Sequence, residues 1–162
     1  MTMQIYVGTY AKYNNGSLKG EWVNLEEHDK DSFYEYILEL HKDEADPEFM
    51  FQDWEEIPDQ YIGESYLDNE FWDYLEFLDT THFDREVVDA GLSLDIPLEN
   101  IEDAYYGEYR DATELAEEYV DSNGMLLDVP ENLQRYFDFE AFGRDLAMDF
   151  IEEDGHWFFA NW

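Results

Sequence analysis

The stretch from Glu64 to Asp103, ESYLDNEFWDYLEFLDTTHFDREVVDAGLSLDIPLENIED, decides the fold of this chain. Large apolar side chains run through it, including Phe71, Trp72 and Leu75. A disordered acidic segment lacks such residues, so we predict a folded segment that holds its acids on the outside. Arg85 is its one basic residue, against thirteen carboxylates: Glu64, Asp68, Glu70, Asp73, Glu76, Asp79, Asp84, Glu86, Asp89, Asp95, Glu99, Glu102 and Asp103.

The composition extends this pattern to the whole chain. The 162 residues include 43 acidic and 8 basic residues, a formal net charge of −35, and 19% of them are aromatic. A charge of this size destabilises a compact state through self-repulsion, and the large apolar area of buried aromatic side chains opposes that effect. Nucleic acid and anionic membranes would repel such a protein. We therefore expect its partner to be a basic surface.

Several classes of protein are excluded by what the sequence lacks. There is no cysteine, which excludes disulfides, thiolate nucleophiles and cysteine metal sites. The segment Met1–Tyr10 has neither the basic start nor the long apolar stretch of a signal peptide. No run of about 18 apolar residues occurs, so we expect no membrane-spanning helix. These observations predict a cytoplasmic protein.

Residues 1–60 are expected to form an N-terminal domain that contains β-structure. Asn14-Asn15-Gly16 is a turn signal between two of its strands. Ser32 and Glu35 have the spacing of a capping box, which predicts a short helix. The predicted strands, rich in β-branched and aromatic residues, are Gln4–Ala11, Leu18–Leu25 and Glu48–Trp54.

Residues 61–103 are expected to form a helical middle domain with three helices. Ser65 is predicted to cap the first, Thr81 to cap a second that ends at Gly91, and Pro97 to open a third. The first helix has an apolar stripe made of Leu67, Phe71, Leu75 and Leu78.

Residues 104–162 are expected to form a mixed C-terminal domain. Asp111 is predicted to cap a helix that stops at Asn123-Gly124, and further helices begin near Pro130 and Asp138. Strands are predicted at Tyr105–Tyr109 and, rich in aromatic residues, at Trp157–Trp162. An apolar strand at a sheet edge needs a partner, and a second copy of the chain would supply one. The predicted fold class is thus α+β, as an elongated chain of three small domains, which carry net charges of −11, −12 and −12.

The sequence offers little support for an enzyme. The four histidines are isolated, and no phosphate-binding loop, dinucleotide fingerprint, nucleophile elbow or EF-hand loop occurs. Pairs of carboxylates for acid–base catalysis arise by chance among so many acids, so they carry no information. We therefore predict no catalytic residue, no cofactor and no structural metal site.

The charge has three interpretations. Solubility alone needs a net charge of about 2–8 in magnitude, and adaptation to high salt explains acids without a specific partner. The third interpretation is mimicry of a polyanion. Duplex DNA carries one charge per ~1.7 Å of axis, so 35 charges correspond to roughly 60 Å of duplex. We favour mimicry, with a target-binding surface made of the thirteen carboxylates above together with Glu114, Glu117 and Glu118.

Two long segments and one short one carry motifs that are found together in one family. The opening segment contains Ile5-Tyr6-Val7-Gly8, Lys12-Tyr13-Asn14-Asn15-Gly16, Leu18, Gly20 and Trp22. The short segment is Ile62-Gly63-Glu64. The strongest motif lies in Gly124–Leu146, at Val129-Pro130, Leu133-Gln134, Tyr136, Asp138, Ala141, Gly143, Arg144, Asp145 and Leu146. In these residues the chain resembles the ArdA antirestriction proteins.

The resemblance implies an inhibitor carried by mobile genetic elements. ArdA proteins mimic bent B-form DNA and occupy the DNA-binding groove of type I restriction–modification enzymes, both the methyltransferase core and the full complex. The family fold is an elongated α+β chain of three small domains that forms a homodimer through the C-terminal one. The alternative function is an acidic chaperone or an inhibitor of another basic DNA-binding protein.

The motif in the C-terminal segment has two interpretations. Leu133, Tyr136 and Leu146 are expected to make core or dimer contacts, and Arg144 to pair with a buried or interfacial carboxylate. The other possibility is that the motif touches the restriction enzyme directly, which requires its polar residues to be exposed.

Overall fold

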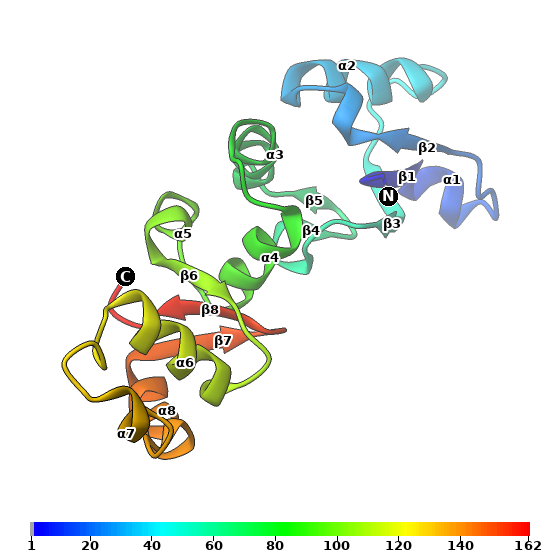
Figure 1. The fold of residues 1–162 in the computed structure, drawn as a ribbon. Coiled ribbons are helices and arrows are strands. Elements are labelled where there is room, and N and C mark those ends of the chain that lie inside the picture. The colour runs from blue at the N-terminus through cyan, green and yellow to red at the C-terminus, as the bar shows by residue number, and fades with distance from the viewer. Residues whose placement is uncertain (1) are drawn as a thin grey trace. The chain divides into compact units, whose positions relative to one another are not determined.

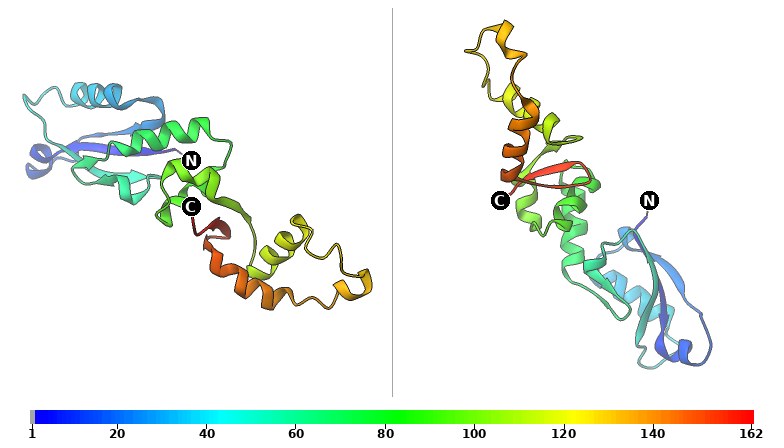
Figure 2. Two further views of the ribbon diagram at one scale, coloured as in Figure 1. Left: turned by 90° about the vertical axis from the view of Figure 1, so that its left-hand side faces the viewer. Right: turned by 90° about the horizontal axis from the view of Figure 1, so that it is seen from below.

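The computed structural model describes residues 2–162, which fold into short helices and small antiparallel sheets (Figures 1 and 2). The α+β class predicted from the sequence is therefore confirmed. Contacts between residues divide the chain into two compact units, Met1–Thr80 and Thr81–Trp162. The finer division into three small domains stays a prediction.

The first unit is built on a three-stranded antiparallel sheet in the order β2-β1-β3. Ile5 and Val7 of the central strand are fully buried, which explains the β-branched pattern of the sequence. The three strands were all predicted, with slightly different ends: β1 (Gln4–Thr9), β2 (Glu21–Asn24) and β3 (Phe49–Glu55). A short helix, α1 (Tyr10–Asn14), follows β1, and the predicted turn contains Gly16 at φ +79°.

Helix α2 (Lys30–Leu40) covers one side of this sheet (Figures 1 and 2) and buries Phe33 and Ile37. Its capping box was misplaced in the prediction, because Asp29 is the N-cap. The Asp29 carboxylate accepts a hydrogen bond from the backbone N–H of Ser32 at 2.8 Å, and the Ser32 hydroxyl accepts from the backbone N–H of Asp29. A 3₁₀ turn, Leu25–Glu27, precedes the helix.

The segment before α3 (Glu70–Thr80) corrects another prediction. Ser65 does not cap this helix, because it lies in the tight turn between β4 (Ile62–Gly63) and β5 (Tyr66–Leu67). Leu67 is therefore a buried strand residue rather than the start of the helical stripe. A 3₁₀ turn, Asp59–Tyr61, precedes β4. Aromatic rings join α3 to this 3₁₀ turn and to α2: the centroids of Tyr61 and Phe71 lie 6.2 Å apart, and those of Phe33 and Trp72 5.8 Å apart.

The second unit begins with two helices, α4 (Arg85–Ser93) and α5 (Leu98–Ala104). The predicted start of α5 after Pro97 is confirmed. The predicted limits of α4 were wrong, since Asp84 is its N-cap and Gly91 lies inside the helix. Gly91 is buried against α5. A side chain at this position would press on Ile101, whose Cγ1 atom lies 3.0 Å from the ideal Cβ position.

A second three-stranded antiparallel sheet follows, in the order β6-β8-β7. Its strands are β6 (Tyr105–Glu108), β7 (Phe150–Glu153) and β8 (His156–Phe159). The aromatic terminal strand β8 is thus central and hydrogen-bonded on both sides. The expectation that β8 forms an open edge was wrong. The position of this strand therefore gives no support for pairing with a second copy.

The helices between β6 and β7 complete the second unit. Asp111 caps α6 (Ala112–Ser122) as predicted, by accepting a hydrogen bond from the backbone N–H of Glu114 at 2.9 Å. The remaining elements are α7 (Glu131–Gln134), α8 (Phe139–Leu146) and a 3₁₀ turn, Ala147–Asp149. Figure 2 shows α6 and α8 beside each other. They enclose a core of Leu115, Ala116, Leu146, Phe150 and Trp157.

Candidate functional site

The predicted target-binding carboxylates lie on the surface of both units. Fourteen of the sixteen are exposed, and only Asp89 and Glu114 are half-buried. Six belong to the first unit: Glu64, Asp68, Glu70, Asp73, Glu76 and Asp79. Ten belong to the second: Asp84, Glu86, Asp89, Asp95, Glu99, Glu102, Asp103, Glu114, Glu117 and Glu118.

Helix α3 presents a regular row of acids. Its carboxylates recur at every third residue from Glu70 to Asp79, while Phe71 and Tyr74 are buried on the opposite side. A helix rises about 1.5 Å per residue, so successive carboxylates are about 4.5 Å apart along its axis. Asp68 stands before the helix and accepts a hydrogen bond from the backbone N–H of Glu70 at 2.9 Å. At about 100° per residue the row turns by about 60° per step, so it winds roughly halfway around the helix from Glu70 to Asp79. The aromatic contacts of α3 fix the position of the helix and hence of each carboxylate.

Helix α5 carries three more exposed acids, Glu99, Glu102 and Asp103. Glu102 accepts a hydrogen bond from the Thr81 hydroxyl at 2.8 Å. The opposite side of the helix buries Ile101. The helix is anchored by that contact, and its carboxylates face solvent.

Two of the predicted residues have local structural roles as well. Asp89 pairs with Arg85 within α4, where the Arg85 Nε atom lies 3.3 Å from the Asp89 Oδ2 atom. Glu114 accepts a hydrogen bond from the backbone N–H of Arg110 at 2.6 Å and so closes the start of α6. The freely exposed acids of α6 are Glu117 and Glu118.

Tyrosines beside α6 remain neutral next to these acids. Burial raises the pKa of Tyr106 and of Tyr109, and the negative charge of Glu118 raises both further. A phenol with a raised pKa stays protonated at neutral pH. The anionic groups of this surface are therefore its carboxylates.

Among the residues that the structure describes, one cluster has the residue types of a metal site. Ligand atoms of His41, Asp43 and Glu44 all lie within 4.8 Å of one another. The Lys12 ammonium lies among them, 3.0 Å from His41 Nδ1, 3.0 Å from Asp43 Oδ1 and 2.6 Å from Glu44 Oε2. His41 Nε2 contacts the Val7 carbonyl oxygen at 3.0 Å. The ammonium thus supplies the positive charge that these ligands need.

The motif segment Gly124–Leu146 divides between core and surface. Gly143 and Leu146 are buried, and Asp138 caps α8 by accepting a hydrogen bond from the backbone N–H of Ala141 at 3.0 Å. Leu133 and Tyr136 are 50% and 70% exposed, so neither belongs to the core of this chain.

Two charged residues of the motif, Arg144 and Asp145, are also exposed. Within residues 2–162 Arg144 forms no ion pair, so it does not neutralise a buried carboxylate of this chain as one interpretation expected. Its pairing across an interface stays a prediction.

Comparison with known proteins identifies the family. The family model described as Antirestriction protein (ArdA) matches residues 5–157, nearly the whole chain. This chain belongs to the ArdA antirestriction family. A search of curated proteins found no match.

The matched range contains both long segments that carried the resemblance, namely strand β1 from Ile5 onward and the motif segment up to α8. An ArdA protein acts in antirestriction, that is, against restriction enzymes. Among residues 2–162, no helix is both long and apolar enough to cross a membrane.

Proposed function

We propose that this ArdA protein is a non-enzymatic mimic of B-form DNA that occupies the DNA-binding groove of type I restriction–modification enzymes. Its partners would be the methyltransferase core and the full restriction complex. The observation that carries the proposal is a surface of exposed carboxylates projected from packed helices.

The spacing of the acids supports mimicry of phosphates. Carboxylates on α3 advance by about 4.5 Å of helix axis per step, which is comparable to the ~3.4 Å of duplex axis per phosphate of one DNA strand. The net charge of −35 matches that of roughly 60 Å of duplex. The acids therefore have both the number and the density that a DNA-binding groove accommodates.

The binding energy would come largely from released counterions. A basic groove binds anions when it is empty, and an incoming polyanion displaces them with a gain in entropy. A rigid array of charges loses little freedom on binding. The aromatic packing beneath α3 supplies that rigidity, so the core of the protein would contribute to affinity as well as to stability.

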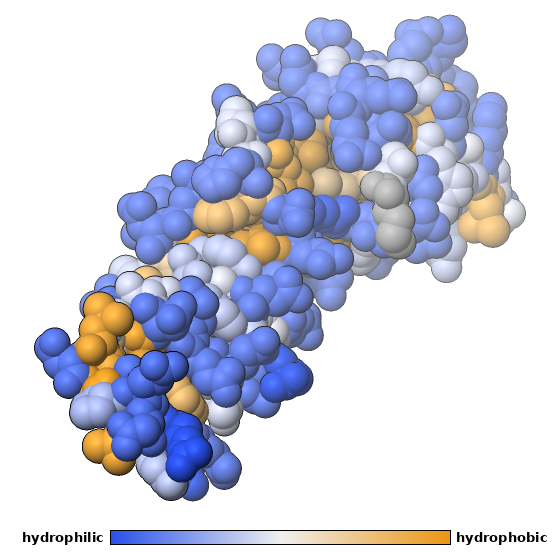
Figure 3. Space-filling view, viewed as in Figure 1, coloured by the Kyte–Doolittle hydropathy of each residue, from blue (hydrophilic) through white to orange (hydrophobic). Residues whose placement is uncertain are grey.

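We also propose that the protein forms a homodimer through its C-terminal region and acts in the cytoplasm of a cell that receives a mobile element. Exposed apolar side chains support a contact surface there: Met125 is 48% exposed, Leu127 83% and Tyr136 70%. Figure 3 shows apolar residues gathered around α7 and the segment that precedes it. Burying such side chains between two copies would stabilise a dimer.

A competition titration tests the proposed function. The protein is added to a type I methyltransferase core that already holds a labelled target duplex, at about 50 mM and about 150 mM salt. We expect displacement at near-stoichiometric protein, retained at the higher salt because the charges are arranged in the shape of a duplex. A length-matched polyglutamate serves as control, since it has charge without shape. Displacement by both at low salt only would refute shape mimicry, and no displacement at all would refute the proposed target.

A series of substitutions tests whether the charges act together. Glu99→Gln and Glu117→Gln singly should each weaken displacement less than about 3-fold, because exposed charges contribute little individually. Combined neutralisation of Glu99, Glu102, Asp103, Glu117 and Glu118 should multiply these losses. A single substitution that abolished inhibition with the fold intact would contradict a distributed charge.

A further inference from the structure

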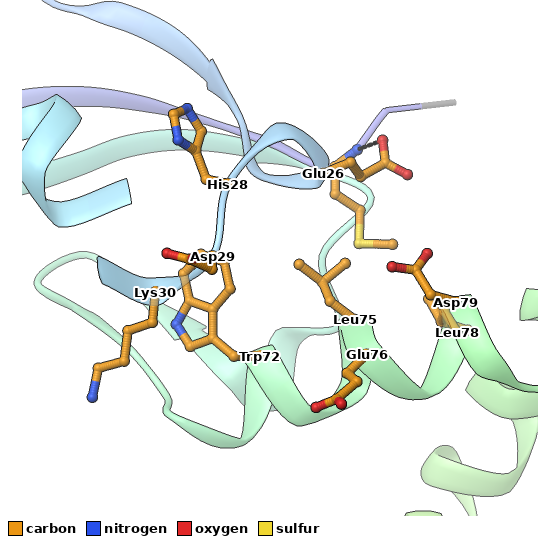
Figure 4. A pocket seen from close by; sticks show the side chains of 10 residues that line it. Glu26, His28, Asp29, Lys30, Trp72, Leu75, Glu76, Leu78 and Asp79 are labelled. Atoms are coloured by element: carbon orange, nitrogen blue, oxygen red, sulfur yellow. Dashed lines mark hydrogen bonds between the residues drawn. The ribbon is translucent and has the colours of Figure 1, made fainter. Parts of the chain in front are cut away.

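The first unit contains a cavity of about 450 Å³ that the acidic surface alone does not explain. It lies between α3 and the segment that leads into α2 (Figure 4). Cavities of this size hold small molecules or single side chains of a partner. The cavity is therefore large enough to receive a group from the target.

One part of the lining is apolar and rigid. It consists of Met3, Trp72, Leu75 and Leu78. The Trp72 ring packs against Phe71, with centroids 5.3 Å apart, and against Phe33 of α2. The indole is thus held in place, with one part of its surface on the cavity. Its Nε1 atom is buried and has no hydrogen-bond partner among the described residues.

The other part of the lining is acidic and comes from two elements. Glu26 and Asp29 precede α2, whereas Glu76 and Asp79 stand on α3 (Figure 4). Lys30 is the one lysine or arginine of the lining, which also includes His28, so four carboxylates stand against one permanent positive charge.

The four carboxylates differ in how many hydrogen bonds they already accept. Glu26 accepts a hydrogen bond from the Met3 backbone at 3.3 Å through one oxygen. The backbone hydrogen bond from Ser32 lowers the pKa of Asp29, which keeps that carboxylate ionised. Within residues 2–162 no hydrogen bond to the side chains of Glu76 and Asp79 occurs. These two acids are available to a ligand.

We infer that this cavity receives an arginine side chain from the basic surface of the target. The inference rests on the proposed function, because that target presents the arginines. An arginine has an apolar stem that fits the leucine and methionine lining. Its planar guanidinium stacks on aromatic faces and donates up to five hydrogen bonds to carboxylates. Lysine lacks the planar head, so it fits less well. The protein would therefore hold its target by one specific anchor in addition to its distributed charge.

The first experiment measures the anchor directly. The ¹⁵N-labelled full-length protein is titrated with N-acetyl-L-arginine amide at constant ionic strength, and the Trp72 indole N–H resonance, assigned with Trp72→Phe, is followed. Because the Trp72 side chain lines the cavity, the resonance of its indole N–H reports changes there. We expect a saturable shift, with binding of N-acetyl-L-lysine amide weaker by about 3-fold or more. A wild-type protein without a saturable shift would overturn the inference.

Charge-matched variants then separate the cavity from bulk charge. Glu76→Gln with Asp79→Asn should weaken binding of the arginine amide by about 5-fold or more, since it removes both negative charges that α3 contributes to the lining and leaves only neutral acceptors there. The control, Glu70→Gln with Asp73→Asn, changes the same helix by the same charge outside the cavity and should weaken binding less than about 2-fold. Leu75→Phe, which fills the cavity without changing charge, should also weaken binding.

The same variants in the duplex competition distinguish this inference from the proposed function. We expect the cavity variant to displace duplex less well than its control. Equal losses for both pairs would overturn the anchor, while displacement of duplex by the wild-type protein would still support DNA mimicry. Failure of the wild-type protein to displace duplex would refute the mimicry, whatever the arginine amide does.

Discussion

Gly143 of the motif is predicted to be essential for packing two helices. An ideal Cβ at this position lies 2.5 Å from the backbone carbonyl oxygen of Ala112, at the start of α6. Ordinary van der Waals contact begins at 3.4 Å. In Gly143→Ala the backbones of α6 and α8 would have to separate by about 0.9 Å, because neither a carbonyl nor a helix backbone can rotate away as a side chain does.

The expected loss of stability follows from two opposing effects. Overpacking a core costs typically about 1–3 kcal/mol, while alanine in place of glycine inside a helix contributes roughly 1 kcal/mol in favour of folding. Because the clash at Gly143 is with backbone atoms, the overpacking cost should lie in the upper part of that range, about 2–3 kcal/mol. We therefore expect Gly143→Ala to lower the free energy of unfolding by about 1–2 kcal/mol. For a unit of this size that corresponds to roughly 4–16 °C in Tm.

Urea and thermal denaturation of the full-length protein provide the assay, and Gly91→Ala provides the matched control. Gly91 is also a buried helical glycine of the second unit, but its Cβ would meet the Ile101 side chain at 3.0 Å rather than a backbone. That side chain can shift, so we expect Gly91→Ala to stay within about 1 kcal/mol of the wild type. A Gly143→Ala protein as stable as the wild type would refute the packing role.

Three further predictions concern polar contacts of Lys12 and Asp111. Lys12→Met should lower the free energy of unfolding by about 1–3 kcal/mol in urea denaturation, because buried His41 loses the donor to its Nδ1 atom; an unchanged midpoint would contradict this. The Lys12 hydrogen bond lowers the pKa of Glu44 and of Asp43, so their stabilisation is present above their unfolded pKa values near 4 and is lost as the pH falls through the lowered ones. The stability difference between wild type and Lys12→Met should therefore shrink in acid titrations below about pH 4, and a constant difference down to pH 2 would contradict it. Asp111→Ala should cost about 1 kcal/mol through loss of the α6 N-cap, and an unchanged helical content and Tm would contradict that role.

Local signals predicted the elements whose ends are set by local contacts. The capping residue Asp111 and the stop at Asn123-Gly124 were both read correctly, because each satisfies its own helix end through neighbours in the sequence. The start of α5 after Pro97 is of the same kind. At these positions the local sequence and the tertiary structure favour the same helix boundary.

Other boundaries depend on contacts with a neighbouring element. Leu67 has helical spacing with Phe71, but it pairs with Ile62 in a hairpin that ends before the helix begins. Gly91 resembles a helix end in the sequence, whereas its lack of a side chain serves the close approach of Ile101 of α5. Helical spacing and end signals do not register either contact, because each partner lies outside the helix concerned.

The central position of β8 could have been predicted from a signal that we missed. Asp154-Gly155 follows β7, and both residues have positive φ, 52° and 85°. An Asp-Gly pair between apolar runs is the strongest short signal for a β-hairpin. Recognising it would have placed β7 beside the terminal strand and removed the expectation of an open edge.

The candidate site was predictable in composition but not in arrangement. The sequence identifies the acids, and the structure confirms that most are exposed. It gave no indication that Asp89 and Glu114 have local structural roles, because those depend on Arg85 and on the backbone N–H of Arg110. The cavity beside Trp72 also escaped prediction, since its lining comes from segments about 45 residues apart in the chain.

The most direct measurement is a structure of the protein bound to a type I methyltransferase core, determined by electron cryomicroscopy. We predict that the protein occupies the DNA groove, with carboxylates of α3, α5 and α6 within ~4 Å of the lysines and arginines that otherwise contact phosphates. A complex in which the protein binds outside the groove while a duplex remains bound would contradict DNA mimicry.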